Sequence, residues 1–187
     1  MRAEAEQRAD QLKPGIVWLA SYPRSGNTWT RNFLHNLFRV IDGKESVPQD
    51  INALGEYTLW DVAGQRFERL LGKPMSWTRK PHRAIYVMRY EDMLQRPLEI
   101  FRGLCRHLLL DPSDTQLARA IELSSFEQAR AQEAQKGYRE RPKQSKAFFR
   151  AGHAGQWRER LSEQQIGRIV SDNREQMGRF NYVPEGL

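Results

Sequence analysis

Cysteine is nearly absent from this 187-residue chain, which contains only Cys105. A single cysteine excludes a disulfide framework, and it excludes a zinc site built from several thiolates. The apolar residues around it in the sequence, Phe101, Leu104 and Leu108, predict a buried thiol rather than a reactive one. The chemistry of the chain must therefore come from other residue types.

Long apolar runs are also missing. No stretch approaches the length of a membrane span, and residues 1–10 lack the apolar centre of a secretion signal. Hydrophobic residues make up 39% of the chain and charged residues 28%, which is typical of a soluble globular protein. The length suits one domain, so we expect a single domain over residues 1–187, located in the cytoplasm.

Positive charge is in excess. The net charge of +7 favours polyanionic partners. Basic residues are frequent and aliphatic residues scarce between residues 132 and 153, which predicts a mobile surface loop or a binding lid. The sequence shows no basic stripe with interleaved aromatic residues and no recognisable nucleic-acid module. We therefore expect a phosphorylated nucleotide, and not a nucleic acid, as the anionic partner.

A strand, a tight turn and a helix follow one another near the N-terminus. Residues 16–21 are mostly large and apolar, which predicts a strand buried in a parallel sheet. From Thr28 to Ile41 the apolar residues recur at helical spacing. Because amides at a helix start favour an anion and Gly26 permits close approach, the turn is suited to a phosphate-like group. The turn consists of Arg24, Ser25, Gly26, Asn27 and Thr28.

The rest of the pattern consists of helices and one further strand. Residues 84–90 are predicted to form a second buried strand. Helices are predicted over residues 59–71, from Pro97, from Ser113 or Asp114 to Ile121, and after a capping box of Ser162 and Gln165. This order predicts an α/β fold with parallel strands, although only two strands are evident.

Four segments resemble one enzyme family. Residues 22–29, Tyr-Pro-Arg-Ser-Gly-Asn-Thr-Trp, resemble the 5′-phosphosulfate loop of the sulfotransferases that use 3′-phosphoadenosine 5′-phosphosulfate (PAPS), usually written Tyr-Pro-Lys-Ser-Gly-Thr-Thr-Trp. Residues 90–93 and 124–127 are similar to the family's Tyr-Glu-Asp-Leu and Thr-Ser-Phe-Glu elements. Residues 148–157 resemble its Phe-x-Arg-Lys-Gly-x-x-Gly-Asp-Trp loop, which clamps the 3′-phosphate. The matches occur in the family's order.

The resemblance implies a three-layer α/β fold with a central parallel sheet and a P-loop-like phosphosulfate-binding turn. It also implies transfer of the sulfuryl group of PAPS to an acceptor hydroxyl or amine, without a metal. The acceptor would be a small molecule, a glycan or a lipid. Arg24 would be catalytic, Trp29 and Phe126 would flank the adenine, and Arg150 with the two following amides would hold the 3′-phosphate. The implied cofactor-binding residues are Arg24, Ser25, Gly26, Asn27, Thr28, Trp29, Tyr90, Ser124, Phe126, Arg150, Ala151 and Gly152.

The chain departs from the family in two ways. Ala151 stands where the family often has Lys and Gln156 where it often has Asp, so the grip on the 3′-phosphate depends more on Arg150. After Pro74 the chain passes directly to Met75, and several dozen residues are absent that would include the histidine base and a further 3′-phosphate-binding strand. Either the protein lacks this central segment, or these two residues are not adjacent in the natural chain.

Three functions follow from these observations. The leading one is a PAPS-dependent sulfotransferase. The alternative is a catalytically degenerate domain that binds PAPS or adenosine 3′,5′-bisphosphate (PAP), because none of the four histidines matches the missing base. A kinase-like phosphotransferase is disfavoured, since the Lys pattern of the ATP-type P-loop and an acidic magnesium ligand after a strand are lacking.

Overall fold

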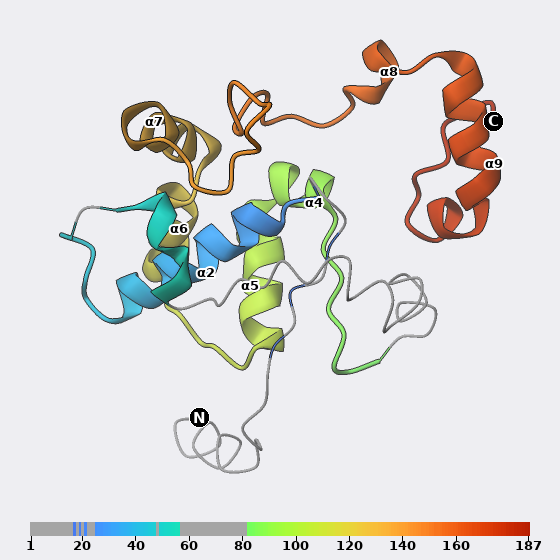
Figure 1. The fold of residues 1–187 in the computed structure, drawn as a ribbon. Coiled ribbons are helices and arrows are strands. Elements are labelled where there is room, and N and C mark those ends of the chain that lie inside the picture. The colour runs from blue at the N-terminus through green and yellow to red at the C-terminus, as the bar shows by residue number, and fades with distance from the viewer. Residues whose placement is uncertain (1–16, 18, 20, 22–24, 48, 57–81) are drawn as a thin grey trace.

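The computed structural model describes residues 17, 19, 21, 25–47, 49–56 and 82–187, which form a largely helical arrangement (Figure 1). The elements are α2 (Asn27–Ile41), the 3₁₀ helix η1 (Ile51–Glu56), α4 (Tyr90–Gln95), α5 (Pro97–His107), α6 (Asp114–Leu123), α7 (Phe126–Lys136), α8 (Trp157–Arg160) and α9 (Glu163–Arg179). No strand occurs within these described ranges. None of the helices found there is long and apolar enough to cross a membrane.

Local sequence signals explain where several helices begin. Ser113 and Ser162 precede α6 and α9, and each hydroxyl accepts the amide of a glutamine three residues later in a capping box. Pro97 occupies the first turn of α5, where its missing amide costs no hydrogen bond. The helix predicted from Thr28 begins one residue earlier, at Asn27. The predictions of these four helices are confirmed.

The prediction of a second strand over residues 84–90 is wrong. Residues 85–89 follow an extended path in Figure 1 without a neighbouring strand among the described residues, and Tyr90 already belongs to α4. The side chains of residues 85–87 are 37%, 37% and 48% exposed rather than buried. A strand is defined by hydrogen bonds to a neighbour, so apolar composition alone does not produce one.

Other predictions fall on residues that the structure does not describe. Half of the predicted first strand, residues 16–21, lies outside the described residues, and residues 17, 19 and 21 are not assigned to a strand. The helix predicted over residues 59–71 and the junction between residues 74 and 75 also lie outside them.

The main core lies between α2, α4, α5 and α6. Phe33 of α2 stacks on Phe101 of α5, with ring centroids 4.0 Å apart and planes inclined by 21°. Cys105 is buried in the same cluster, which confirms the prediction of a buried thiol. Removing these apolar side chains from water is the main force that holds the four helices together. The buried members are Phe33, Leu34, Leu37, Met93, Phe101, Leu104, Cys105, Leu117 and Ala120.

A smaller core joins η1, α7 and the basic segment after α7, which consists of residues 137–153. Ile51, Ala129 and Tyr138 are buried in it, and Phe148 and Phe149 pack against them. Residues 132–136, part of the predicted loop or lid, belong to α7. The basic segment is attached to α7 through its aromatic side chains.

Helix α9 lies apart from the helical cluster in the view of Figure 1 and buries Val170. Ile169, the preceding residue of the helix, is 43% exposed. The chain after α9 returns to α4, where the Tyr182 hydroxyl donates a hydrogen bond to Glu91. The Arg89 guanidinium lies 4.6 Å from the centre of the Tyr182 ring. These contacts attach the C-terminal part to the cluster.

Candidate functional site

The turn before α2 presents backbone amides to an anion. Gly26 is the N-cap residue and has a φ of +95°, a left-handed conformation that favours glycine. Because Gly26 has no side chain to cap the helix, the amides of the first turn and the positive end of the helix dipole are available to an anion. Of the predicted turn, residues 25–28 are described, whereas Arg24 lies outside the described residues.

The turn is in contact with α4. A Cβ atom at Gly26 would lie 3.3 Å from the Met93 sulfur and 3.4 Å from the Tyr90 ring, so a larger residue would press on both. Burial raises the pKa of the Tyr90 hydroxyl, and the charge of Glu91 raises this pKa further. The hydroxyl is therefore protonated at neutral pH and can donate a hydrogen bond. The structure thus brings two of the predicted binding elements together.

Trp29 and Phe126, predicted to flank the adenine, have different surroundings, as does Ser124, another predicted cofactor-binding residue. Trp29 lies edge-on to Tyr90 and to Phe101, with ring centroids 6.1 and 5.6 Å apart. Ser124 is buried, and its hydroxyl donates to the Ile121 carbonyl oxygen over 3.1 Å. Phe126 begins α7 and has no ring contact with Trp29. Flanking of an adenine by Trp29 and Phe126 stays a prediction.

The Arg150 loop lies directly against α7. Gly152 has a φ of +68°, and a Cβ atom placed on it would lie 2.7 Å from the ring of Phe126. The ring of Phe149 meets the same Phe126 ring edge to face, with centroids 6.3 Å apart. Two motifs that the sequence connects only through a resemblance are therefore in contact.

A buried polar network links α2 to the basic segment. The Arg31 guanidinium donates to both carboxylate oxygens of Glu140, over 2.9 and 3.0 Å, and the Tyr138 hydroxyl donates to the same carboxylate over 2.7 Å. Burial raises the pKa of Tyr138, and the bond to Glu140 adds to this, whereas a hydrogen bond with Thr28 opposes it. Thr28 of the turn before α2 therefore lies beside the start of the basic segment.

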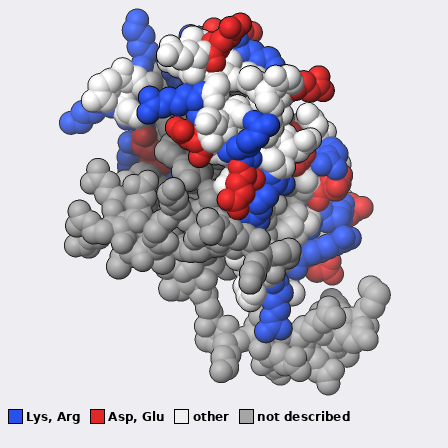
Figure 2. Space-filling view, turned by 90° about the vertical axis from the view of Figure 1, so that its right-hand side faces the viewer, with Lys and Arg blue, Asp and Glu red and all other residues white. Residues whose placement is uncertain are grey.

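Charges of both signs are mixed on the face shown in Figure 2. Several surface arginines are paired with carboxylates, for example Arg96 with Asp92 and Arg102 with Asp114. Such pairs neutralise their own charge locally and contribute little to binding a ligand. On this face of the molecule the basic residues do not form one continuous stripe.

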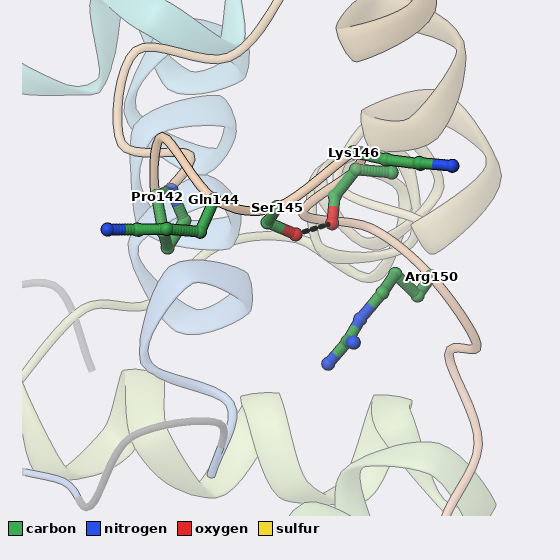
Figure 3. A pocket seen from close by; sticks show the side chains of 6 residues that line it. Pro142, Gln144, Ser145, Lys146 and Arg150 are labelled. Atoms are coloured by element: carbon green, nitrogen blue, oxygen red, sulfur yellow. Dashed lines mark hydrogen bonds between the residues drawn. The ribbon is translucent and has the colours of Figure 1, made fainter.

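Arg150 lines two open hollows. The first, of about 610 Å³, is lined by Pro142, Gln144, Ser145, Lys146, Ala147 and Arg150. Figure 3 shows that the Arg150 and Lys146 side chains point in different directions, so these two cationic groups do not converge on one point. The second, of about 360 Å³, is lined by Arg150, Ala151, Gln156 and Arg160. Arg150 and Arg160 form no ion pair with any described acidic residue.

Arg160 was missed by sequence reasoning. It lies in the short basic run Trp-Arg-Glu-Arg of α8, immediately after the loop that resembles the 3′-phosphate clamp. The nearness of that run to the loop was the signal that could have identified it. Two guanidinium groups on one hollow suit a doubly charged anion such as a phosphate monoester. In the described part of the chain, no group of three or more metal-ligating side chains is found.

Comparison with known proteins gives two matches. A family model described as "Sulfotransferase domain" matches residues 71–181, more than half of the chain. "Cytosolic sulfotransferase 16" from Arabidopsis thaliana is 28% identical over 118 residues, which cover 58% of this chain and 35% of the relative. The chain therefore spans about a third of the length of this curated relative. No solved structure matches the chain.

Proposed function

This chain belongs to the sulfotransferase domain family, and we propose that it is a sulfotransferase that takes its sulfuryl group from PAPS. The contact between Gly152 and Phe126 carries the proposal. It joins the segment that would hold the 3′-phosphate to the aromatic residue that would lie against the adenine. One adenosine nucleotide could then contact both segments at once.

The residues around Arg150 fit the 3′-phosphate. The amides of Ala151 and Gly152 donate to no acceptor within the described residues. Arg150 and Arg160 supply two cationic groups on one hollow. Backbone amides and forked guanidinium groups are the donors that phosphate oxygens prefer. Arg160 would supply the charge that Ala151 does not.

The start of α2 would hold the 5′-phosphosulfate. Bound PAPS supplies the sulfuryl group: its sulfur–oxygen bond to the bisphosphate breaks as a bond forms to the acceptor oxygen or nitrogen. The amides of residues 25–28 would stabilise negative charge on the leaving and equatorial oxygens, as would the hydroxyls of Ser25 and Thr28. Arg24 would neutralise the leaving oxygen. The acceptor proton passes to a base.

The proposal extends to the fold and the setting of the protein. The family match supports a three-layer α/β fold, with a central parallel sheet between two helical layers. Residues 1–187 would form one domain. The printed name of the Arabidopsis relative supports a cytoplasmic location. We propose a small molecule, a glycan or a lipid as the acceptor.

Calorimetric titration with PAP tests the nucleotide site. We expect Arg150→Ala and Arg24→Ala each to weaken binding about tenfold or more, because each removes a charged donor from a phosphate or phosphosulfate group. Arg168→Ala is the matched control, since Arg168 lies on α9, is 84% exposed at its side chain and faces Asp172. Unchanged affinity in both site variants would overturn the site assignment.

A second function is a PAPS- or PAP-binding domain without catalysis. It is favoured because none of the four histidines of the chain matches the family's base. Transfer of labelled sulfate from PAPS to a panel of phenols, alcohols and glycans separates the two functions. Turnover of any acceptor excludes the second function, whereas tight PAP binding without turnover supports it.

A further inference from the structure

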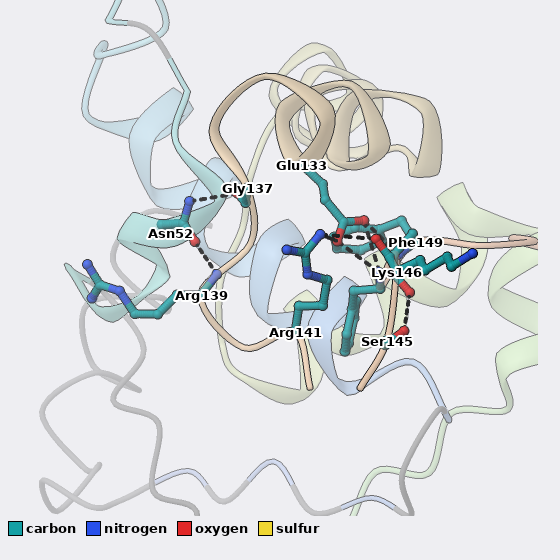
Figure 4. A network of polar contacts seen from close by, with 10 residues as sticks. Asn52, Glu133, Gly137, Arg139, Arg141, Ser145, Lys146 and Phe149 are labelled. Carbon is teal, nitrogen blue, oxygen red and sulfur yellow. Dashed lines mark hydrogen bonds and ion pairs between the residues drawn. The ribbon is translucent and has the colours of Figure 1, made fainter. Parts of the chain in front are cut away.

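Glu133 of α7 accepts hydrogen bonds from the chain just before Arg150. Its carboxylate receives the amide of Phe148 at 2.8 and 3.1 Å and the amide of Phe149 at 2.9 Å (Figure 4). Glu133 is only 7% exposed, although glutamate is normally a surface residue. A buried carboxylate is costly unless its oxygens are hydrogen-bonded, and here the bonds come from two successive amides.

Glu133 and Phe126 hold the loop at two points of one helix face. They are seven residues apart on α7, which places them two turns, or about 10 Å, apart on the same side. Phe149 is held at the Glu133 end and Gly152 lies against Phe126. Three residues of extended chain span about 10 Å, so the segment from 149 to 152 runs back along α7. Arg150 is located between these two attachments.

The chain reverses direction at the end of α7 before it returns. Gly137, with a φ of +73°, ends the helix, and its amide donates to the Glu133 carbonyl oxygen over 2.9 Å. The side chain of Asn52 in η1 stabilises this turn. Its Nδ2 donates to the Gly137 carbonyl oxygen over 3.2 Å, and its Oδ1 accepts the backbone amide of Arg139 over 2.7 Å. Arg141 approaches the Glu133 carboxylate to 4.0 Å. Figure 4 shows the contacts of Asn52 and the contacts of Glu133 as two neighbouring groups.

From this arrangement we propose that Glu133 is a positioning residue for the 3′-phosphate site, a role that rests on the proposed function. Its carboxylate accepts hydrogen bonds from the amides of Phe148 and Phe149 and thereby fixes the backbone immediately before Arg150. The amides of Ala151 and Gly152, two residues further on, are left to face a ligand. Glu133 touches no ligand itself, and it acts by restricting the loop to the conformation that binds an anion.

Glu133→Gln tests this role, because glutamine keeps the size but replaces one of the two acceptor oxygens with an NH₂ group, which cannot accept a hydrogen bond from a backbone amide. We expect affinity for PAP to fall about tenfold. Affinity for adenosine 5′-phosphate, which lacks the 3′-phosphate, should change less than about twofold. Glu127→Gln removes the same charge from an exposed position of α7 and should leave both affinities unchanged. General destabilisation would instead weaken both ligands together.

The outcomes separate this proposal from the proposed function. If the wild-type chain binds PAP no better than adenosine 5′-phosphate, the proposed 3′-phosphate site itself is wrong. If it discriminates and Glu133→Gln discriminates equally well, the positioning role is wrong. Should Glu133→Gln fail to fold, hydrogen exchange in the wild-type chain decides. The amides of Phe148 and Phe149 should exchange more slowly with PAP than with adenosine 5′-phosphate, and equal exchange overturns the proposal.

Discussion

Gly152 lies so close to Phe126 that a side chain at position 152 would collide with the aromatic ring: a Cβ atom there would be 2.7 Å from the nearest ring carbon. Phe126 precedes the basic segment, and Gly152 lies near the end of that segment. Their contact fixes how the Arg150 loop approaches α7. The glycine is therefore required by space as well as by its left-handed backbone conformation.

Gly152→Ala should destabilise the chain by about 1–3 kcal/mol, because the methyl group displaces Phe126 and φ is unfavourable for alanine. Affinity for PAP should fall with it. Urea unfolding and calorimetry provide the two measurements. Gly167→Ala is the control: it lies within α9 with open space at its Cβ, so the same substitution should stabilise by about 0.5–1 kcal/mol. A neutral Gly152→Ala would contradict the contact.

Arg160→Ala should weaken PAP binding about three- to tenfold, less than Arg150→Ala, because Arg160 lines only the second of the two hollows. The effect on adenosine 5′-phosphate should be small. Arg158 of the same helix provides a matched control, since its guanidinium lies 4.5 Å from the centre of the Trp157 ring and does not line the hollow. Equal losses for both arginines would point to a general effect of charge.

The pair of Arg31 and Glu140 should contribute strongly to stability, because their side chains are only 6% and 17% exposed. Glu140→Gln removes a carboxylate charge that pairs with a buried cation and should cost about 3 kcal/mol in urea unfolding. Arg31→Met combined with Glu140→Gln should cost less than the sum of the single changes. The exposed pair of Arg102 and Asp114 is the comparison, and Asp114→Asn should cost less than about 1 kcal/mol.

Cys105 should be unreactive in the folded chain. Burial raises the pKa of its thiol from 9.0 to about 11, so little thiolate forms at pH 8. A chromogenic disulfide reagent should detect no thiol in the native protein and one in urea. Rapid reaction of the native protein would place Cys105 outside the core.

The same pKa determines how stability depends on pH. Because the folded thiol ionises at a higher pH than the unfolded one, its contribution is present below pH 9 and is lost as pH rises through 11. Cys105→Ala should show a smaller loss of stability over this range. Tyr138, whose pKa is also raised, contributes in the same direction in both proteins.

Helices with regular apolar spacing and clear caps were predictable, as α2, α5, α6 and α9 show. Helix α7 was not predicted, because its sequence is mostly polar and two of its buried residues are Gln132 and Glu133. The error over residues 85–89 has a related cause: apolar residues indicate burial only where a partner exists. The spacing of apolar residues indicates which face of a helix is buried. It does not indicate which polar side chains are buried against a hydrogen-bond partner.

The amino-acid sequence by itself determined the positions of the capped helices and of the two glycine-bearing turns, because these depend on residues close together in the chain. It also showed that the four segments that resemble sulfotransferase motifs follow one another in the order typical of the family. Only the tertiary structure decided that Gly152 contacts Phe126 and that Glu133 accepts hydrogen bonds from the two amides before Arg150. It also decided that Arg150 and Arg160 line the same hollow. Such pairings depend on which distant segment lies opposite a buried or charged group, and no local pattern records that.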